Sequence, residues 1–296
     1  MAKTESTTGR DGAPEIEMNR MPFGRWFREI GWRHVIGVLA ILFAAFPVLY
    51  VISASLNPLG TVASTRLIPT RISLVNYQTL LSGARGPFLR WYLNTIIVCS
   101  IVAASQIFLS VLAAYAFARL RFPGRRALFW AYVATLMVPP IVTVIPLFSM
   151  LSQLGLRNTF AGLVAPFLLG SPYAIFLLRQ NFQAIPQEVL DAATLDGAGH
   201  WRTLRSIVLP MNRPILAALT LITVVSQWNA FLWPSVIAPG RTWSVLTVAT
   251  QALQEERSGN WTLVMAATTV ALAPLVVLFL AFNRQIVAAL GIGDVR

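Results

Sequence analysis

Charged side chains are scarce in this sequence. Asp, Glu, Lys and Arg make up only 11% of the 296 residues, whereas hydrophobic residues make up 56% and the mean hydropathy is +0.66. A soluble domain usually carries about 25% charged residues, because a folded body needs a hydrated surface. The composition therefore excludes an ordinary soluble globular protein and indicates a chain that is surrounded by lipid.

Two residue types are almost absent. The single lysine is Lys3 and the single cysteine is Cys99. A phosphate-binding P-loop needs a lysine after glycine, so any ATP hydrolysis that this chain uses would have to come from a partner. One cysteine cannot form a disulfide within the chain, and we interpret Cys99 as a small apolar residue.

Six stretches of the sequence, each 21 to 32 residues long, contain no Asp, Glu, Lys or Arg. An α-helix needs about 20 apolar residues to cross roughly 30 Å of hydrocarbon, and a charge at the bilayer centre costs roughly 2.5–3.5 kcal/mol. Buried helices of a large soluble protein, the alternative, would not recur six times at this length. We predict an all-α membrane protein with six transmembrane helices, near residues 35–56, 91–117, 127–149, 159–178, 212–234 and 261–283.

The basic residues predict the orientation. The chain has 23 basic and 11 acidic residues, a formal net charge of +12. If both termini are cytoplasmic, 16 basic residues lie inside and 7 outside, and the short connection 119–126 alone holds four arginines. Positive charge in short loops favours the cytoplasmic side. We therefore expect an N-in, C-in topology and interpret the basic excess as an orientation signal, with no nucleic acid as a partner.

The residues before the first predicted span form a region of their own. We predict a cytoplasmic tail with an interfacial segment over 1–33 and a six-helix permease-like domain over 34–296. The interfacial prediction rests on aromatic residues among the arginines of 20–33, namely Phe23, Trp26, Phe27 and Trp32, a pattern that suits anionic lipid. A cleaved signal peptide is the alternative, but the first apolar run exceeds the usual length of about 7–15 residues.

None of the predicted spans has Asp, Glu, Lys, Arg or His in its middle. Ion-coupled transporters usually need such groups, so this absence argues against a secondary transporter, although a sodium site made of carbonyls and hydroxyls would escape the test. His34 and His200 lie far apart outside the bilayer core, which leaves no visible metal cluster or nucleophile–base pair. We expect no enzyme activity and no metal site in this chain.

The most informative segment is 185–210, between the fourth and fifth predicted spans, which reads IPQEVLDAATLDGAGHWRTLRSIVLP. Pro186 suits the first position of a helix, and Gly197 suits a left-handed turn that ends it. A second helix is predicted from about His200 to Leu209, with Pro210 as its stop.

Both short helices are expected to be amphipathic. In the first, Val189, Ala192 and Ala193 would share one face; in the second, Trp201, Leu204 and Val208 would lie on one side. Two such helices between membrane spans would make a compact docking segment. A pair of helices lying on the lipid surface is the alternative.

The spacing in this segment resembles the signature of the membrane subunits of ABC importers, which reads Glu-Ala-Ala, three residues, Gly, nine residues, Ile-x-Leu-Pro. The present chain has Asp191-Ala192-Ala193, Gly197 and Ile207-Val208-Leu209-Pro210 at the same spacing. The one departure is aspartate in place of glutamate, which keeps the charge and shortens the side chain by one methylene group.

Other strings are similar to carbohydrate-uptake permeases of the MalG and UgpE kind, over residues 35 to 293. They are AAYAFAR at 113–119, MVP at 137–139, LGLRNT at 154–159 and WNAFLWP at 228–234. The resemblance implies a binding-protein-dependent permease with a type I ABC importer fold, located in the cytoplasmic membrane of a bacterium.

The resemblance also implies partners: a second homologous permease, two ATP-binding cassette ATPase subunits that bind ATP and Mg²⁺, and an extracytoplasmic solute-binding protein. This subunit would itself be non-catalytic and free of cofactors, and segment 185–210 would dock on an ATPase. The candidate coupling residues are Glu188, Asp191, Ala192, Ala193, Asp196, Gly197, Trp201, Leu209 and Pro210. Ala192, Ala193 and Gly197 would permit a close fit, and Asp191 would pair with a basic group of the ATPase.

The solute would be a sugar or related polyol of the disaccharide, oligosaccharide or glycerol-3-phosphate type. Sugars bind through hydrogen bonds and through stacking on aromatic rings, so the candidates at membrane depth are Asn94, Tyr173, Gln227, Trp228, Asn229 and Trp233. Asn229 with Trp228 or Trp233 is the preferred constellation. Interfacial tryptophan and helix-bonding asparagine are an equally simple interpretation. Connections 57–90 and 235–260 would meet the solute-binding protein.

Overall fold

The computed structural model describes residues 31–58, 71–84, 86–255 and 260–289, the last six of these by their backbone alone. Every regular element among these residues is helical, which confirms the all-α prediction. The chain divides into two compact units, Met1–Tyr50 and Val51–Arg296. The interfacial segment predicted over 20–33 lies almost entirely outside the described residues.

Helix α2, Trp32–Ser55, begins in the first unit and is 24 residues long. It contains no charged residue after Arg33, and Pro47 lies within it without ending it. The guanidinium of Arg33 lies 5.8 Å from the centroid of the Trp32 ring. A helix of this length and composition can cross a membrane.

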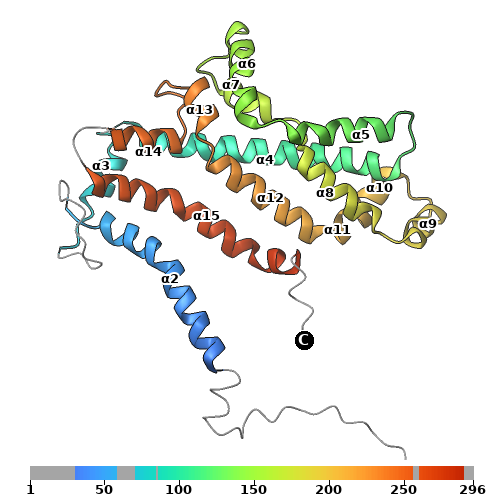
Figure 1. The fold of residues 1–296 in the computed structure, drawn as a ribbon, viewed down its shortest axis with the longest axis horizontal. Coiled ribbons are helices and arrows are strands. Elements are labelled where there is room, and N and C mark those ends of the chain that lie inside the picture. Colours follow the sequence, from blue (N-terminus) through green and yellow to red (C-terminus); the bar gives the residue numbers. More distant parts are fainter. Residues whose placement is uncertain (1–30, 59–70, 85, 256–259, 290–296) are drawn as a thin grey trace, which may run out of the picture. The chain divides into compact units, whose positions relative to one another are not determined.

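The second unit contains the remaining described helices (Figure 1). The α-helices are α3 Val75–Leu81, α4 Phe88–Arg119, α5 Arg125–Ala134, α6 Pro140–Gln153, α7 Phe160–Val164, α8 Pro172–Gln183, α9 Gln187–Leu195, α10 His200–Thr203, α11 Leu209–Met211, α12 Arg213–Trp228, α13 Leu232–Ile237, α14 Leu246–Glu255 and α15 Trp261–Ala289. The 3₁₀ turns are η3 Thr135–Met137 and η4 Ala165–Phe167, and η5 Leu204–Val208 is π-helical.

The longest helix, α4, is the centre of this unit. It packs against α8 along one side and α12 along another, and α12 packs in turn against α15 (Figure 1). Small residues lie where these helices meet, since Ala114, Ala174, Ala266 and Ala267 are almost completely buried. Alanine at such positions lets helices approach closely, as packing between membrane helices requires.

The described helices that are long and apolar enough to cross a membrane are Trp32–Ser55, Phe88–Arg119, Phe160–Gln183 and Trp261–Asn283. The third predicted span, 127–149, is wrong as a single helix, because Arg125–Met137 and Pro140–Gln153 meet at 99°. The backbone is extended at Val138 and Pro139 (ψ 116° and 129°). Each of these residues precedes a proline, which disfavours the helical conformation.

The fifth predicted span, 212–234, is also longer than the helix found there. Helix α12 ends at Trp228 after 16 residues, and the side-chain amide of Asn229 donates to the carbonyl of Val225 (2.8 Å). At its other end, Arg213–Trp228 meets the segment His200–Met211 at 81°. The structure therefore has four helices that can span a membrane, or up to six if each bent pair is one span.

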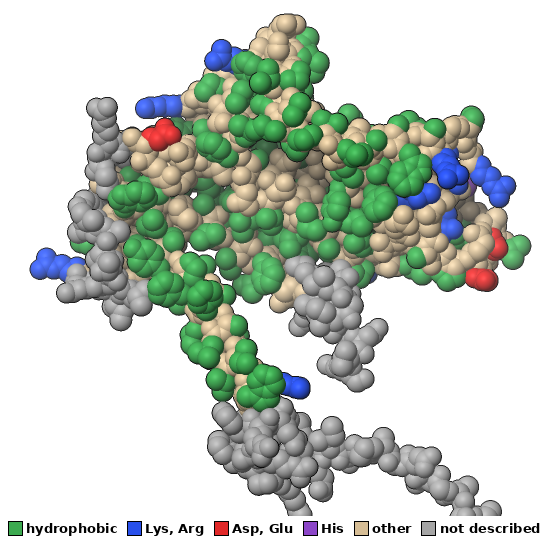
Figure 2. All heavy atoms as spheres, viewed as in Figure 1, with side chains coloured by type: hydrophobic (Ala, Val, Ile, Leu, Met, Phe, Trp, Pro, Cys, Tyr) green, Lys and Arg blue, Asp and Glu red, His purple; other side chains and the backbone are tan. Residues whose placement is uncertain are grey.

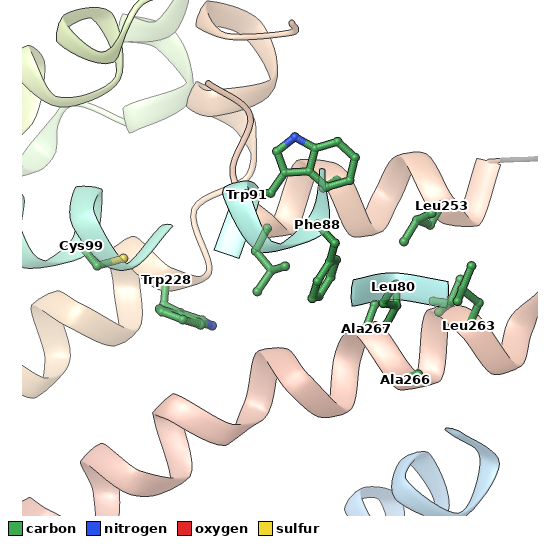
Figure 3. Packing of buried hydrophobic residues seen from close by; sticks show 12 residues of the cluster. Leu80, Phe88, Trp91, Cys99, Trp228, Leu253, Leu263, Ala266 and Ala267 are labelled. Carbon is green, nitrogen blue, oxygen red and sulfur yellow. The ribbon is translucent and has the colours of Figure 1, made fainter. Parts of the chain in front are cut away.

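Among the described residues, four hydrophobic clusters hold the unit together, and one of them packs α5 on α4 and α8 through Phe129, Phe117 and Ile175. The other three are larger. The first joins α3, α4, α12, α14 and α15, where Leu80, Phe88, Leu253 and Leu263 converge (Figure 3). The second joins the C-terminal half of α4 to α8, α9, η5 and the first half of α12, and the third packs α7 and α13 on the middle of α4. Segment 185–210 is thus attached to the helical body through its own hydrophobic core.

The surface agrees with a lipid environment. Hydrophobic side chains cover much of the face in Figure 2, and charged side chains gather toward the ends of the second unit. On α6, for example, Ile141, Val142 and Ile145 are 62%, 61% and 77% exposed. Such a surface would be unfavourable in water and is expected for residues that face acyl chains.

Candidate functional site

Helix α9 begins and ends close to the predicted positions. Pro186, predicted as the first helical residue, is the N-cap, so the helix begins one residue later, at Gln187, and Glu188 lies in its first turn. At the other end the N–H of Ala198 donates to the carbonyl of Ala193 (2.9 Å) and the N–H of Gly197 to that of Thr194 (3.0 Å). This is a Schellman motif. Gly197 has φ +73°, which confirms the left-handed turn.

The two sides of α9 differ sharply. Leu190 and Ala193 point inward and are 9% and 6% exposed. The opposite side is exposed and carries Glu188, Val189, Asp191, Ala192 and Asp196. The predicted common face of Val189, Ala192 and Ala193 is therefore wrong, because the inward direction passes between Leu190 and Ala193 and leaves the other two residues outside.

The inward side of α9 belongs to the second hydrophobic cluster. Leu190 lies there with Phe182 and Leu178 of α8, which are fully buried, and with Leu204 and Val208 of η5. Because the same cluster includes residues of α4 and α12, α9 is packed directly on helices that form the body of the unit.

Arg119, the last residue of α4, fastens the start of α9. Its Nη2 donates to the carbonyl oxygens of Phe182 and Ile185, the latter at 3.0 Å, and its Nη1 lies 3.4 Å from Oε1 of Gln187. The amide Nε2 of Gln187 donates in turn to Oδ1 of Asp191 (2.9 Å). Sequence reasoning did not select Arg119 as a site residue; its only signal is that it ends the string at 113–119.

The second helix of the segment runs further than predicted. α10, η5 and α11 form one continuous helix, His200–Met211, that passes through Pro210. Pro210 as a stop is therefore wrong. The preceding π turn, Leu204–Val208, explains this, because a wider turn accommodates the proline ring and the missing N–H. The helix ends at Asn212, whose side chain donates to the carbonyl of Val208 (2.8 Å).

The predicted common side of this helix is also wrong in part. Leu204 and Val208 are 3% and 0% exposed, but Trp201 is 62% exposed. Trp201 lies before the π turn, and the extra residue in that turn rotates the later side chains relative to it. Leu209 and Pro210 are half-buried.

A cavity of about 250 Å³ lies between α12, α14 and α15. Its polar lining consists of Asn229 directly after α12, Thr268 on α15 and four residues of α14, namely Thr247, Thr250, Gln251 and Gln254. Trp228 supplies an aromatic wall and packs edge-to-face on Tyr92 (6.1 Å between ring centroids). None of the described residues that line this cavity is charged. We call it the α12–α14–α15 cavity.

The structure brings only Trp228 and Asn229, of the six solute-path candidates, to this cavity. Trp233 is 6% exposed and its Nε1 donates to the carbonyl of Gly162 (3.2 Å). Tyr173 is 45% exposed on α8. Gln227 lines a separate small pocket beside Trp233.

Asn94 has a different position. It is 7% exposed, and its amide donates to the carbonyl oxygens of Thr242 and Ser244 (3.0 Å each). The neighbouring Thr95 Oγ1 accepts from the N–H of Leu246 (2.8 Å). These bonds fix the chain where α14 begins, in the connection 235–260 that we expect to meet a binding protein.

Three residues of the α12–α14–α15 cavity, Thr250, Gln251 and Gln254, were not predicted from the sequence, because polar residues in a connection between spans are not unusual.

The chain matches one known protein family over most of the segment described above. A family model described as "Binding-protein-dependent transport system inner membrane component" matches residues 106–291. This match covers more than half of the chain and includes α9 and the α12–α14–α15 cavity. The chain belongs to this family. It is therefore the inner-membrane permease component of a binding-protein-dependent transport system, which confirms the predicted location and does not favour an ion-coupled secondary transporter.

Curated relatives agree with this assignment. The chain is 30% identical over 277 residues to the arabinooligosaccharides transport system permease protein AraQ of Halalkalibacterium halodurans, with 90% of this chain and 97% of that protein covered. It is 35% identical over 266 residues to the sn-glycerol-3-phosphate transport system permease protein UgpE of Salmonella typhi, with 87% and 94% covered. The predicted resemblance to UgpE-like permeases is confirmed.

Solved structures show the same fold. One is a bacterial ABC transporter involved in the import of the acidic polysaccharide alginate, with a TM-score of 0.75, 24% identity, and 90% of this chain and 100% of that chain covered. The second is the alginate transporter in complex with an alginate pentasaccharide-bound periplasmic protein, with a TM-score of 0.62 and 17% identity, covering 88% and 96%. The predicted fold of an ABC importer permease is confirmed.

Proposed function

We propose that this permease forms half of the translocation path of an ATP-driven importer of saccharides or related polyols. Its partners are a second homologous permease, two ATPase subunits and an extracytoplasmic solute-binding protein. ATP and Mg²⁺ bind to the ATPase subunits, so the permease itself catalyses no reaction and holds no cofactor. The names of AraQ and UgpE, which transport arabinooligosaccharides and sn-glycerol-3-phosphate, support this class of solute.

In this proposal each bent pair of helices forms one span, giving six spans with both termini in the cytoplasm. The end of the second unit that carries α9 is then cytoplasmic. The exposed arginines at that end, Arg121, Arg126, Arg202 and Arg205, support this orientation, because basic residues in short connections favour the cytoplasmic side. Figure 2 shows basic side chains gathered there.

The exposed side of α9 is the proposed docking surface for an ATPase, and its geometry is the observation that carries the proposal. Glu188, Asp191 and Asp196 give it a negative charge, while Val189 and Ala192 keep part of it flat and apolar. Asp191 receives one hydrogen bond, from Gln187, and its other carboxylate oxygen is free to accept a bond from a basic side chain of the partner.

The buried side of α9 provides the mechanical connection. A displacement of α9 by the ATPase would reach α8 and η5 through the contacts of Leu190, and it would reach α4 through the bonds of Arg119 to the carbonyls of Phe182 and Ile185. Packed elements move together because close-packed interiors deform little. The docking surface and the spans are therefore coupled through one short chain of contacts.

The α12–α14–α15 cavity is the proposed solute contact of this subunit. Amides and hydroxyls there can hydrogen-bond to a polyol, and the part of the mostly buried Trp228 ring that lines the cavity can contact its C–H groups. Since none of the lining residues that the structure describes is charged, the cavity favours an uncharged saccharide or polyol over an anionic solute. A phosphate or carboxylate would lose its hydration there without an ion-pair partner.

A tryptophan on α9 tests the docking surface. Ala192 is exposed, so Ala192→Trp adds bulk to the surface without disturbing the core. We expect the ATPase to dissociate during purification and solute-stimulated ATP hydrolysis to fall at least about tenfold, an energy of roughly 1.4 kcal/mol. Gly197→Trp should act in the same way, with an additional loss of stability from the left-handed backbone.

The matched control is Gln183→Trp, which adds the same side chain at an exposed position at the end of α8. It should retain the ATPase and its stimulation. The thermal midpoint of Ala192→Trp should equal that of the wild type. Retention of the ATPase together with full coupling in Ala192→Trp would refute the docking role of α9.

A further inference from the structure

A second polar cavity, of about 480 Å³, lies between the end of α4, α9 and the start of α10. We call it the α4–α9–α10 cavity. Its volume falls within the range of roughly 300–1,000 Å³ that is usual for small-molecule sites. None of the residues that we assigned to the docking surface or the solute path lines it.

The lining of this cavity is strongly basic. Three arginines take part, Arg119, Arg121 and Arg125, together with His200. The remaining polar groups are neutral and belong to Tyr115, Gln187, Thr194 and Thr203. No acidic side chain is among the described residues that line the cavity. Asp191 of α9, which accepts from Gln187, and Asp196, directly after α9, are both exposed.

The arginines have no anionic partner in the part of the chain that the structure describes. Arg119 uses its two terminal nitrogens on carbonyl and amide oxygens, and its Nε is buried without a partner. Arg125 donates to the carbonyl of Leu120 (2.8 Å). Arg121 is exposed at the edge of the cavity. Neighbouring like charges repel one another, and a bound anion would remove this cost.

We propose that the α4–α9–α10 cavity binds a phosphate group. Guanidinium groups offer paired N–H donors that match phosphate oxygens, and such charge-assisted bonds are about twice as strong as neutral ones. The hydroxyl groups of Thr194, Thr203 and Tyr115 supply further donors around the same space. The phosphate group comes from a soluble phosphorylated compound or from the headgroup of an anionic phospholipid.

Binding at this place would add to the bonds by which Arg119 already joins α4 to the start of α9. The walls come from the end of α4, the turn after it, the first residue of α5, α9 and α10. An anion there would tie α9 to α4. Binding of an anion in this cavity does not depend on the proposed docking function of α9. An effect of that anion on the coupling between ATPase and permease does depend on it.

The test compares two double variants of the full-length chain, purified with the subunits that accompany it. Arg121→Gln with Arg125→Gln removes two charges from the cavity. Arg126→Gln with Arg202→Gln removes two exposed charges from the same end of the molecule that do not line it. Phosphate bound by other subunits contributes equally to all three preparations.

The soluble probe is inorganic phosphate, measured by equilibrium dialysis and by the thermal midpoint, with chloride at equal ionic strength as the reference. The lipid probe is a nanodisc of phosphatidylcholine with or without phosphatidylglycerol. We expect one probe to bind or stabilise the wild type and the control variant, and to act at least about tenfold more weakly on the cavity variant.

Each outcome decides the proposal. A selective effect of inorganic phosphate supports a soluble ligand, and a selective effect of phosphatidylglycerol alone supports a lipid headgroup. If both double variants lose the effect equally, the response is general electrostatics and the proposal is overturned. It is also overturned if chloride reproduces the effect, or if neither probe distinguishes the wild type from the cavity variant.

Discussion

The two polar cavities of the second unit differ in charge. The α4–α9–α10 cavity is lined by three arginines and a histidine, whereas the α12–α14–α15 cavity is lined by amides, hydroxyls and one tryptophan. Arginine at the first can hold an anion tightly. Neutral groups at the second can form hydrogen bonds to the hydroxyl groups of a polyol, and these bonds are weak enough for the polyol to be released. Among the described residues, the charged side chains thus line the first cavity and not the proposed solute contact.

The two regions are also fixed in different ways. Around α9, the charged side chain of Arg119 bonds to backbone carbonyls at the end of α8 and before α9. Around α14, the neutral side chains of Asn94 and Thr95 bond to the backbone that leads into the helix. A charged side chain thus holds the first region and neutral side chains hold the second.

The largest effect is expected for Arg119→Leu. The carbonyls of Phe182 and Ile185 would lose their donor, and each unsatisfied buried group costs about 1–3 kcal/mol. We expect a lower thermal midpoint and loss of transport. Arg126→Leu, at an exposed position of the same turn, should change both values little. Equal behaviour of the two variants would show that Arg119 acts only through its charge.

An intermediate effect is expected from the two tryptophans of the string at 228–234. Trp228→Ala should raise the KM for the transported solute about tenfold, roughly 1.4 kcal/mol, because Trp228 lines the neutral cavity. Trp233→Phe should lower the thermal midpoint and leave KM unchanged, because it removes buried ring volume and the bond from Nε1 to the carbonyl of Gly162, away from this cavity. Trp228 is itself buried in the first hydrophobic cluster, so both variants should lower the thermal midpoint, and only Trp228→Ala should raise KM. A KM effect from Trp233→Phe in uptake kinetics would contradict the assignment.

The smallest effect is expected from two adjacent threonines of α15. Both hydroxyls donate to carbonyls of their own helix, Thr268 to Val264 (2.9 Å) and Thr269 to Met265 (2.8 Å). Only Thr268 lines the neutral cavity. Thr268→Val should raise KM about threefold, which corresponds to one net hydrogen bond of roughly 0.5–1.5 kcal/mol. Thr269→Val should be indistinguishable from the wild type in the same uptake assay.

Much of the fold was predictable because charged side chains are excluded from the hydrocarbon region of a membrane. The gaps between charged residues place α2, α4 and α15 within a few residues of their observed bounds. The bends could not be predicted in this way. At Val138–Pro139 and after Trp228 the charge-free stretch continues although the helix ends there, so a count of charges passes over the break.

The candidate sites were predictable to different degrees. Gly197 was correct because a left-handed turn leaves a direct mark on residue type. The separation of Trp228 from Trp233 was not predictable, since it depends on α12 ending at Trp228. Arg119 was missed because its partners are backbone carbonyls. Every residue has such a group, so the sequence does not show which ones will accept a hydrogen bond.

The continuous helix through Pro210 has a geometric consequence. His200–Met211 is a stiff arm of twelve residues, roughly 18 Å long at 1.5 Å per residue, and a single residue, Asn212, joins it to α12. A rotation of about 10° at that joint would shift the far end by about 3 Å, which is close to the diameter of an atom. A lever of this length turns a small tilt of α12 into a displacement at Trp201 that a protein surface can recognise.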